Sequence, residues 1–196
     1  MIPEIIFFSV ISIFALLIRG KKLNAINKAF EIKGYQILII AAAVELAAEF
    51  VYKNFSGGGL FETLSFHWLI YLAILAVTLL NFNKTFMKLL FIGTLMNFIA
   101  IISNDFKMPV FVAEIVSNAE TKRIYLQTGQ DLVHSLLTEE TRFKILCDII
   151  TLPPPYPYPK TISFGDVFLL IGVFAAWQES GKKETSKESP ANDSNV

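Results

Sequence analysis

Five long apolar segments constrain this sequence more than any other feature. They run over residues 2–18, 35–52, 66–82, 86–103 and 164–177. A helix needs roughly 20 mostly apolar residues to cross the hydrocarbon core of a bilayer, with roughly 17 as the lower limit. The first four segments reach that limit and the last is short. We therefore predict an all-α integral membrane protein, a bundle of about five transmembrane helices with an outer amphipathic helical segment.

The composition agrees with a membrane class. Hydrophobic residues make up 54% of the chain and charged residues only 17%, which is more apolar than the core of a soluble domain of this length requires. The charges balance at 17 basic against 17 acidic residues, and no basic block is dense enough to predict a nucleic-acid partner. The expected partners are the lipid bilayer and other membrane proteins.

The positions of the basic residues predict an orientation. The first apolar segment is not a cleavable signal peptide, because its positive charges follow the apolar run and no small-residue cleavage site appears. Ten basic residues fall on one side of the predicted bundle: Arg19, Lys21, Lys22, Lys28, Lys33, Lys84, Lys88, Lys182, Lys183 and Lys187. Only Lys53 lies in the short loop opposite. By the positive-inside rule the amino terminus is expected outside and the carboxyl terminus in the cytoplasm.

Three segments outside the apolar runs have recognisable patterns. Residues 19–34 place Leu23, Ile26 and Phe30 on one helical face and predict an interfacial cytoplasmic helix. Residues 138–150 follow a possible Thr138 cap with an apolar stripe at helical spacing, which predicts an amphipathic helix within the outer segment 104–162. The proline-rich run 153–159 predicts an extended polyproline spacer. Residues 1–178 thus form the predicted bundle, and residues 179–196 a disordered tail.

A carboxylate inside an apolar run is the most conspicuous polar group. Glu45 and Glu49 lie one helical turn apart in the second segment, and Glu45 lies about 10 Å below the outer end of that segment. A carboxylate at that depth is costly and faces the bundle interior or a wet cavity. His67 and Asn97 fall at similar depth, so these four residues form a candidate polar cluster. The alternatives are a packed, protonated carboxyl group and a site for a proton, a cation or a ligand.

Other polar motifs have simpler explanations. Ser163 and Asp166 form a Ser-x-x-Asp pattern before the last apolar run, which predicts a helix cap. The only cysteine, Cys147, lies on the apolar stripe and is expected to pack quietly. The two histidines, His67 and His134, are too few and too unlike in setting to predict a haem or zinc site, so neither a metal nor a cofactor is expected.

The carboxyl-terminal half resembles a known family. The segments "KMPV", "TEETRFKILCDII" and "SFGDVFLLIGVF", with a histidine between the first two, resemble a family of small bacterial polytopic membrane proteins classed only as a domain of unknown function. The resemblance covers mainly residues 97–178. The family pattern has an arginine where this chain has Lys107 and tends to have glycine at Cys147. The matching positions are Asn104, Lys107, Met108, Pro109, Val110, His134, Thr141, Asp148, Gly165 and Asp166. The resemblance implies a bacterial plasma (inner) membrane and no particular activity.

Three functions fit these sequence features. The absence of a recognisable catalytic constellation and the ordered outer segment favour an accessory or binding subunit. The buried Glu45 favours a small proton-coupled or small-molecule transporter. A membrane-surface enzyme using Asp148, Asp166 and His134 is a third possibility.

Overall fold

The computed structural model describes residues 2–20, 30–55, 67–115, 118–156 and 159–181. Its regular elements, in chain order, are α1 Ile2–Ile18, α3 Tyr35–Phe55, α5 His67–Leu80, α6 Thr85–Ile102, β1 Met108–Val110, α7 Ala119–Gln127, β2 His134–Leu136, the 3-10 helix η1 Lys144–Leu146, β3 Ile150–Leu152, β4 Lys160–Ile162 and α8 Phe164–Ser180.

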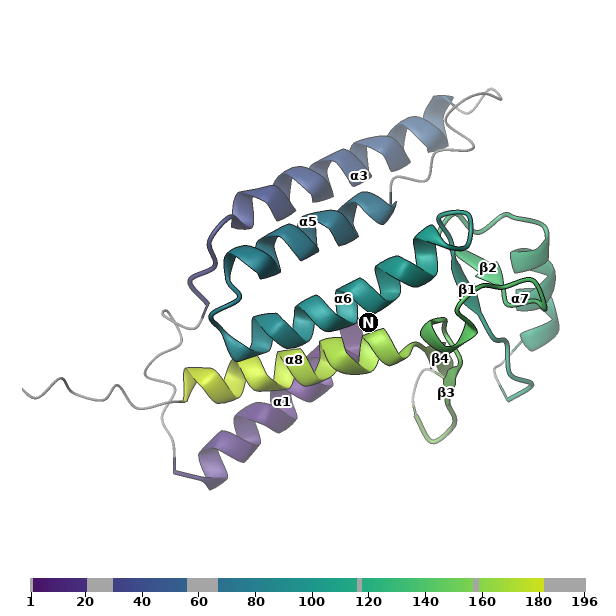
Figure 1. Ribbon diagram of the computed structural model, residues 1–196. Helices are drawn as coiled ribbons and strands as arrows, with labels where there is room; N and C mark the ends of the chain where they lie inside the picture. Colours follow the sequence, from purple (N-terminus) through teal and green to yellow (C-terminus); the bar gives the residue numbers. More distant parts are fainter. Residues whose placement is uncertain (1, 21–29, 56–66, 116–117, 157–158, 182–196) are drawn as a thin grey trace, which may run out of the picture.

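The long helices lie side by side in the order α3, α5, α6, α8, α1 (Figure 1). The α6–α8 contact is the most extensive, because glycines allow the two backbones to approach closely. A Cβ atom added at Gly165 would lie 2.0 Å from Asn97 Oδ1 and 2.7 Å from the carbonyl oxygen of Gly93. These contacts fix α8 against the carboxyl-terminal half of α6, where the remaining chain is attached.

Buried polar residues tie the helices together at other points. Asn81, at the end of α5, is 1% exposed; its side chain accepts from the amide of Lys33 and donates to the carbonyl of Lys33, both at 2.9 Å. The hydroxyl of Ser12 on α1 donates to the carbonyl of Phe174 on α8 at 2.8 Å. These two buried polar side chains therefore have specific partners, as a closely packed interior requires.

Residues 103–163 form a small unit at one end of the bundle, which we call the cap (Figure 1). β1 pairs in parallel with β2, and Val110 of β1 also forms a bridge to Asp148 on its other side. β3 pairs antiparallel with β4, which leads directly into α8. One small apolar core lies inside the cap around Val110 and Leu126, and a second joins Met108 and Cys147 of the cap to α6.

The predicted bundle of five transmembrane helices is wrong. Each of the five apolar segments forms a helix, but of the described helices only α6, with 18 residues, is long and apolar enough to cross a membrane. The apolar stretches of three others, Pro3–Ile18, Tyr35–Ala48 and Trp68–Leu80, are shorter. At 1.5 Å per residue a stretch of 13 to 16 residues spans only about 20–24 Å, against about 30 Å of hydrocarbon. Hydropathy found the helices but overestimated their spanning length.

The predicted outer amphipathic helix and the all-α class are also wrong. Within residues 138–150 the described structure has turns and the single 3-10 helix η1, after which β3 begins at Ile150. The amide of Asp148 donates to the carbonyl of Pro109, and the amide of Phe111 donates to the carbonyl of Asp148. Backbone pairing with β1 therefore replaces the helical hydrogen bonds that the apolar spacing predicted. β-branched residues at 149–151 favour that extended path.

The proline-rich run is not a straight spacer. The amide of Tyr156 donates to the carbonyl of Pro153, and β3 and β4 pair antiparallel on either side, so the chain reverses its direction there. Residues 21–29 of the predicted interfacial helix and residues 182–196 of the predicted tail lie outside the described residues.

Candidate functional site

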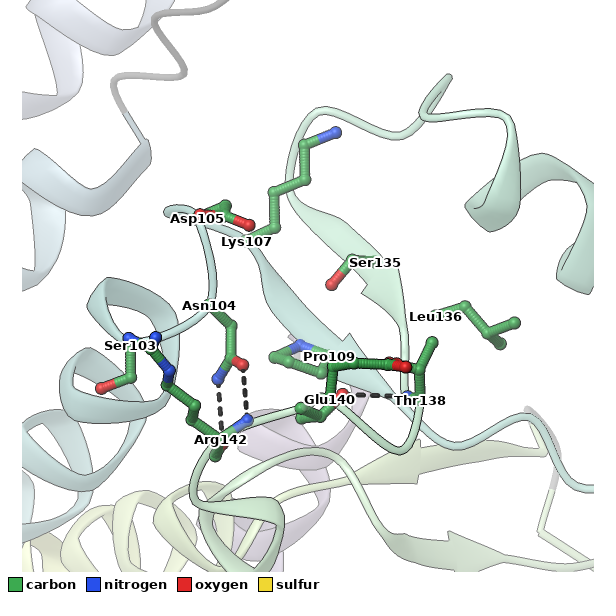
Figure 2. Close-up of a pocket in the computed structure, with 11 residues that line it drawn as sticks. Ser103, Asn104, Asp105, Lys107, Pro109, Ser135, Leu136, Thr138, Glu140 and Arg142 are labelled. Carbon is green, nitrogen blue, oxygen red and sulfur yellow. Dashed lines mark hydrogen bonds between the residues drawn. The ribbon is translucent and has the colours of Figure 1, made fainter.

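A polar cleft of about 410 Å³ opens in the cap, next to the carboxyl end of α6 (Figure 2). Its walls are the turn after α6, the first two strands and the segment before η1. The lining residues are Ser103, Asn104, Asp105, Lys107, Pro109, Ser135, Leu136, Thr138, Glu140, Thr141 and Arg142. Most of these side chains carry hydrogen-bonding groups, whereas the surrounding helices are apolar. In ligand sites, polar groups that converge in a concave site orient the ligand and provide specificity.

Asn104 holds two walls of the cleft together. Its amide nitrogen donates to the carbonyl of Ala100 at 2.7 Å and to the carbonyl of Arg142 at 3.0 Å, and its amide oxygen accepts from the amide of Arg142 at 2.9 Å. The carbonyls in the last turn of a helix have no partner within the helix. Asn104 therefore closes the end of α6 and fixes residue 142 beside it, 38 residues away in sequence.

The strands supply the third wall. Pro109 of β1 and Ser135 of β2 are paired in register, and Figure 2 shows the Ser135 side chain pointing into the cleft. Leu136, the next residue, also lines the cleft and packs against the apolar core of the cap.

The cleft carries charges of both signs. The ammonium group of Lys107 donates to the carbonyl of Asp131 at 2.6 Å, and in Figure 2 it points away from Arg142. Among the described residues, the guanidinium of Arg142 has neither a hydrogen bond nor an ion pair. A hydrogen bond from Thr138 lowers the pKa of Glu140, so this exposed carboxylate is ionised at neutral pH. Arg142 is thus the cation most available to a ligand.

Strained backbone flanks the cleft on both sides. Asp105, Phe106 and Phe143 have φ values of 53°, 59° and 49°, in the left-handed region that disfavours residues with a Cβ. Each such residue costs about 1–2 kcal/mol, and strain of this kind clusters at functional sites. Here it places the exposed rings of Phe106 and Phe143 directly beside the lining residues of the cleft.

A buried carboxyl group lies behind the cleft. Asp148 is 8% exposed, and burial together with the nearby charge of Asp166 raises its pKa to about 8. Its backbone pairs with β1, so the side chain cannot move to solvent without opening the cap. The carboxyl group is therefore protonated at neutral pH.

A second polar junction joins the cap to the bundle. The hydroxyl of Ser163 donates to Asn97 Oδ1 at 2.7 Å, and the Asn97 amide nitrogen donates to Asp166 Oδ1 at 2.9 Å. The amide of Asp166 donates to the Ser163 hydroxyl at 2.9 Å, which completes a capping box at the start of α8. The predicted helix cap is confirmed. Gly165 is required beside it because a side chain there would collide with Asn97.

The structure gathers most of the family positions in the cap. Asn104, Lys107, Pro109 and Thr141 line the cleft, Met108 and Val110 lie in the adjoining cores, and Gly165 and Asp166 lie at the α8 cap.

His134 Nδ1 lies 3.2 Å from the Asp131 carboxylate. Burial alone would raise the pKa of Asp131, but hydrogen bonds from the amides of His134 and Val133 outweigh it and hold the pKa below its ordinary value.

The four residues of the candidate polar cluster are distributed over three helices. Asn97 on α6 bonds to α8, as described above. Glu45 is half-buried on α3, which packs against α5. Glu49 and His67 lie within α3 and α5, and their side chains are outside the described part of the structure. The shared site of these residues stays a prediction.

Sequence reasoning missed several cleft residues, notably Ser103, Ser135 and Thr138. Isolated Ser and Thr residues in a loop-rich segment carry no signal of their own. The cysteine gives a clearer negative result: Cys147 is fully buried, and burial raises the pKa of its thiol to about 11, which disfavours the reactive thiolate. The described residues contain no group of three or more potential metal ligands.

Comparison with known proteins identifies a family but no activity. No curated protein matches the chain, and no solved structure matches it. The model of a family of unknown function, DUF5317, matches residues 29–178. The match covers more than half of the chain, and it begins well before residue 97, the start of the region where the sequence resemblance was noted. It includes all three walls of the cleft and the capping box at the start of α8, and this chain belongs to that family of unknown function.

Proposed function

We propose that this chain is a membrane-associated binding or accessory protein whose cap holds a polar ligand or a partner segment in the cleft. The observation that carries the proposal is the position of the cleft: it begins at Ser103, one residue after the end of the only described helix that is long and apolar enough to cross a bilayer. A polar site at that point lies at the boundary between lipid and water.

The exposed surfaces of the helices favour a membrane environment. Phe14 on α1, Leu46 on α3 and Phe50 on α3 are each more than 60% exposed. Single exposed apolar residues are common in soluble proteins, but contiguous apolar faces mark interaction with lipid or protein. Lys84 and Lys88 lie at the start of α6, and by the positive-inside rule this favours a cytoplasmic position for that end and an outer position for the cap.

Ser135 offers a direct test of the binding function. Ser135→Leu would place a large side chain in the cleft, whereas Ser135→Ala, the matched control, leaves the space open. The chain and both variants are purified gently from the native membrane, and everything that copurifies is identified by mass spectrometry. We expect a molecule or protein that accompanies the wild type and Ser135→Ala but is lost from Ser135→Leu. An unchanged set in all three preparations would refute the binding function of the cleft.

A second candidate function is transport through Glu45. Glu45 is half-buried on α3, which packs against α5, and Tyr71 of α5 packs against the core joining α6 to the cap. A carboxyl group within an apolar helix pair is a common proton or ion site. Glu45→Gln should then abolish any flux measured in vesicles while leaving the folded protein intact. Unchanged flux in this variant would remove the transport function.

A further inference from the structure

Two phenylalanines beside the cleft are held outward by strained backbone. Phe106 is 47% exposed and Phe143 is 58% exposed, and both have positive φ values. The pair of hydrogen bonds between Asn104 and Arg142 brings the two turns together, so both rings flank the same junction. Ile145, two residues after Phe143, is 65% exposed. We call these three exposed apolar side chains, Phe106, Phe143 and Ile145, the apolar rim.

The rim is continuous with the end of the apolar helices. Ile102, the last residue of α6, is 43% exposed, and the ring of Phe106 lies 5.6 Å from that of Trp68 in the first turn of α5. Aromatic residues near the ends of apolar helices sit at the headgroup level of a bilayer, where one side of the ring is wet. The rim and the Trp68–Phe106 pair therefore fit the interface of the same membrane.

The only cation of the cleft that is free among the described residues lies in the same place. Figure 2 shows the Arg142 side chain extending toward Ser103, at the end of α6. Its guanidinium has no partner there, whereas Lys107 is occupied by backbone carbonyls. A guanidinium matches the geometry of a phosphate group with two parallel hydrogen bonds. Phosphate esters are the anions that occur at this depth of a bilayer.

We infer that the cleft receives the phosphate-bearing headgroup of a phospholipid, with Arg142 facing the phosphate and Phe106, Phe143 and Ile145 inserted in the interface beside it. The inference rests on the proposed function, since it names the ligand class of the same cleft. The carboxylates of Asp105 and Glu140 in the cleft disfavour a second anionic group and suit a headgroup that also carries an amine or hydroxyls.

Lipid retention tests the role of Arg142. The delipidated protein in a maltoside detergent is titrated with phosphatidylethanolamine or phosphatidylglycerol, and bound lipid is counted by native mass spectrometry. We expect Arg142→Gln to weaken retention about tenfold, the loss of one charge-assisted hydrogen-bonded pair. Lys144→Gln is the control, because Lys144 pairs with Glu139 at 3.3 Å and does not line the cleft.

This titration distinguishes a phospholipid headgroup from free phosphate as the ligand of the cleft. Equal retention by wild type and Arg142→Gln would overturn the headgroup inference, and so would displacement of the lipid by excess inorganic phosphate, which would identify a free phosphate as the ligand. If Arg142→Gln has no effect while Ser135→Leu still strips a copurifying molecule, only the headgroup inference fails. If Ser135→Leu also has no effect, the proposed function fails with it.

Fluorescence quenching tests the rim. Trp177→Phe leaves Trp68 as the only tryptophan, beside Phe106. In vesicles of brominated phosphatidylcholine, bromines near the headgroup end of the acyl chain should quench Trp68 more strongly than bromines near the chain end. Quenching that is absent, or strongest for the deepest bromines, would contradict the interfacial placement of the rim.

Discussion

The helical bundle and the cap satisfy their backbone hydrogen bonds in different ways. In the bundle each helix satisfies its own backbone, so its order is local and its exterior can be apolar. The cap has strands of only three residues, held by pairings between distant segments. All four non-glycine residues with positive φ in the described structure, Asp105, Phe106, Asn118 and Phe143, lie in the cap. The bundle thus provides a rigid support, and the cap carries the strained, polar features associated with binding.

The largest effect is expected where the bundle holds the cap. Gly165→Ala places a Cβ atom 2.0 Å from Asn97 Oδ1, in the closest part of the α6–α8 contact. We expect the free energy of unfolding to fall by about 3 kcal/mol, at the upper end of overpacking effects. Gly129→Ala in the cap is the control: nothing lies within 4 Å of its added Cβ, and its positive φ alone should cost about 1 kcal/mol. Equal losses of unfolding free energy for the two variants in denaturant titrations would contradict the expected difference between the α6–α8 contact and the cap.

The pH dependence of the unfolding free energy tests the cap separately from the bundle. The pKa of Asp148 is raised from 3.8 to about 8 in the folded protein. Below pH 4 the carboxyl group is protonated in both states; as the pH rises, the unfolded chain loses this proton first, so stability falls. We expect a loss of about 2 kcal/mol between pH 6 and pH 8. Asp148→Asn should remove this part of the pH dependence, and an unchanged slope in that variant would contradict the assignment.

Asn104 tests whether the cap depends on a few specific bonds. Asn104→Ala removes three hydrogen bonds at the junction of α6 and residue 142. We expect a loss of about 1–2 kcal/mol, because part of the site is exposed and water replaces some of the bonds. The amide of Arg142 should exchange with solvent much faster in the variant, while the amides of α6 before Ile99 keep their wild-type rates. Uniform acceleration throughout would show that cap and bundle are not separate units.

The smallest effect is expected at the amino-terminal capping residue of α8. Ser163→Ala removes the acceptor for the Asp166 amide and the donor to Asn97, at the boundary between cap and bundle. Loss of an N-cap side chain costs about 1 kcal/mol. Thermal unfolding followed by circular dichroism should show a small decrease in melting temperature without loss of helix content. A decrease larger than that of Gly165→Ala would reverse the ranking of the two contacts.

The sequence predicted the bundle better than the cap because its signals are local. The apolar run over residues 2–18 coincides with α1, and the Ser163–Asp166 pattern correctly marks the start of α8. Apolar periodicity depends only on neighbouring residues, so it survives in any tertiary context. The number of membrane-crossing helices did not follow from it, because a run near the lower length limit gives no decision between a spanning helix and a shorter packed one.

The cap could not be predicted from local patterns. Residues 143–150 carry a helical apolar spacing, yet Asp148 pairs with β1 from a distance of 38 residues in sequence, and Phe143 adopts a left-handed conformation. No local sequence pattern in residues 108–110 or 134–136 indicates that these segments pair as parallel strands. Several positions shared with the family nevertheless line the candidate cleft, which apolar periodicity did not indicate.

Cysteine accessibility tests most directly the proposal that the exposed apolar faces of the helices contact lipid and that the cap faces water. Single cysteines are introduced in a Cys147→Ala background at Phe14→Cys and Leu46→Cys in the bundle and at Gln130→Cys in the cap, all exposed positions. Intact cells or spheroplasts are then treated with a membrane-impermeant maleimide. We predict that only the cap cysteine is labelled until detergent is added, after which all three react. Labelling of the bundle cysteines in intact membranes would contradict the account.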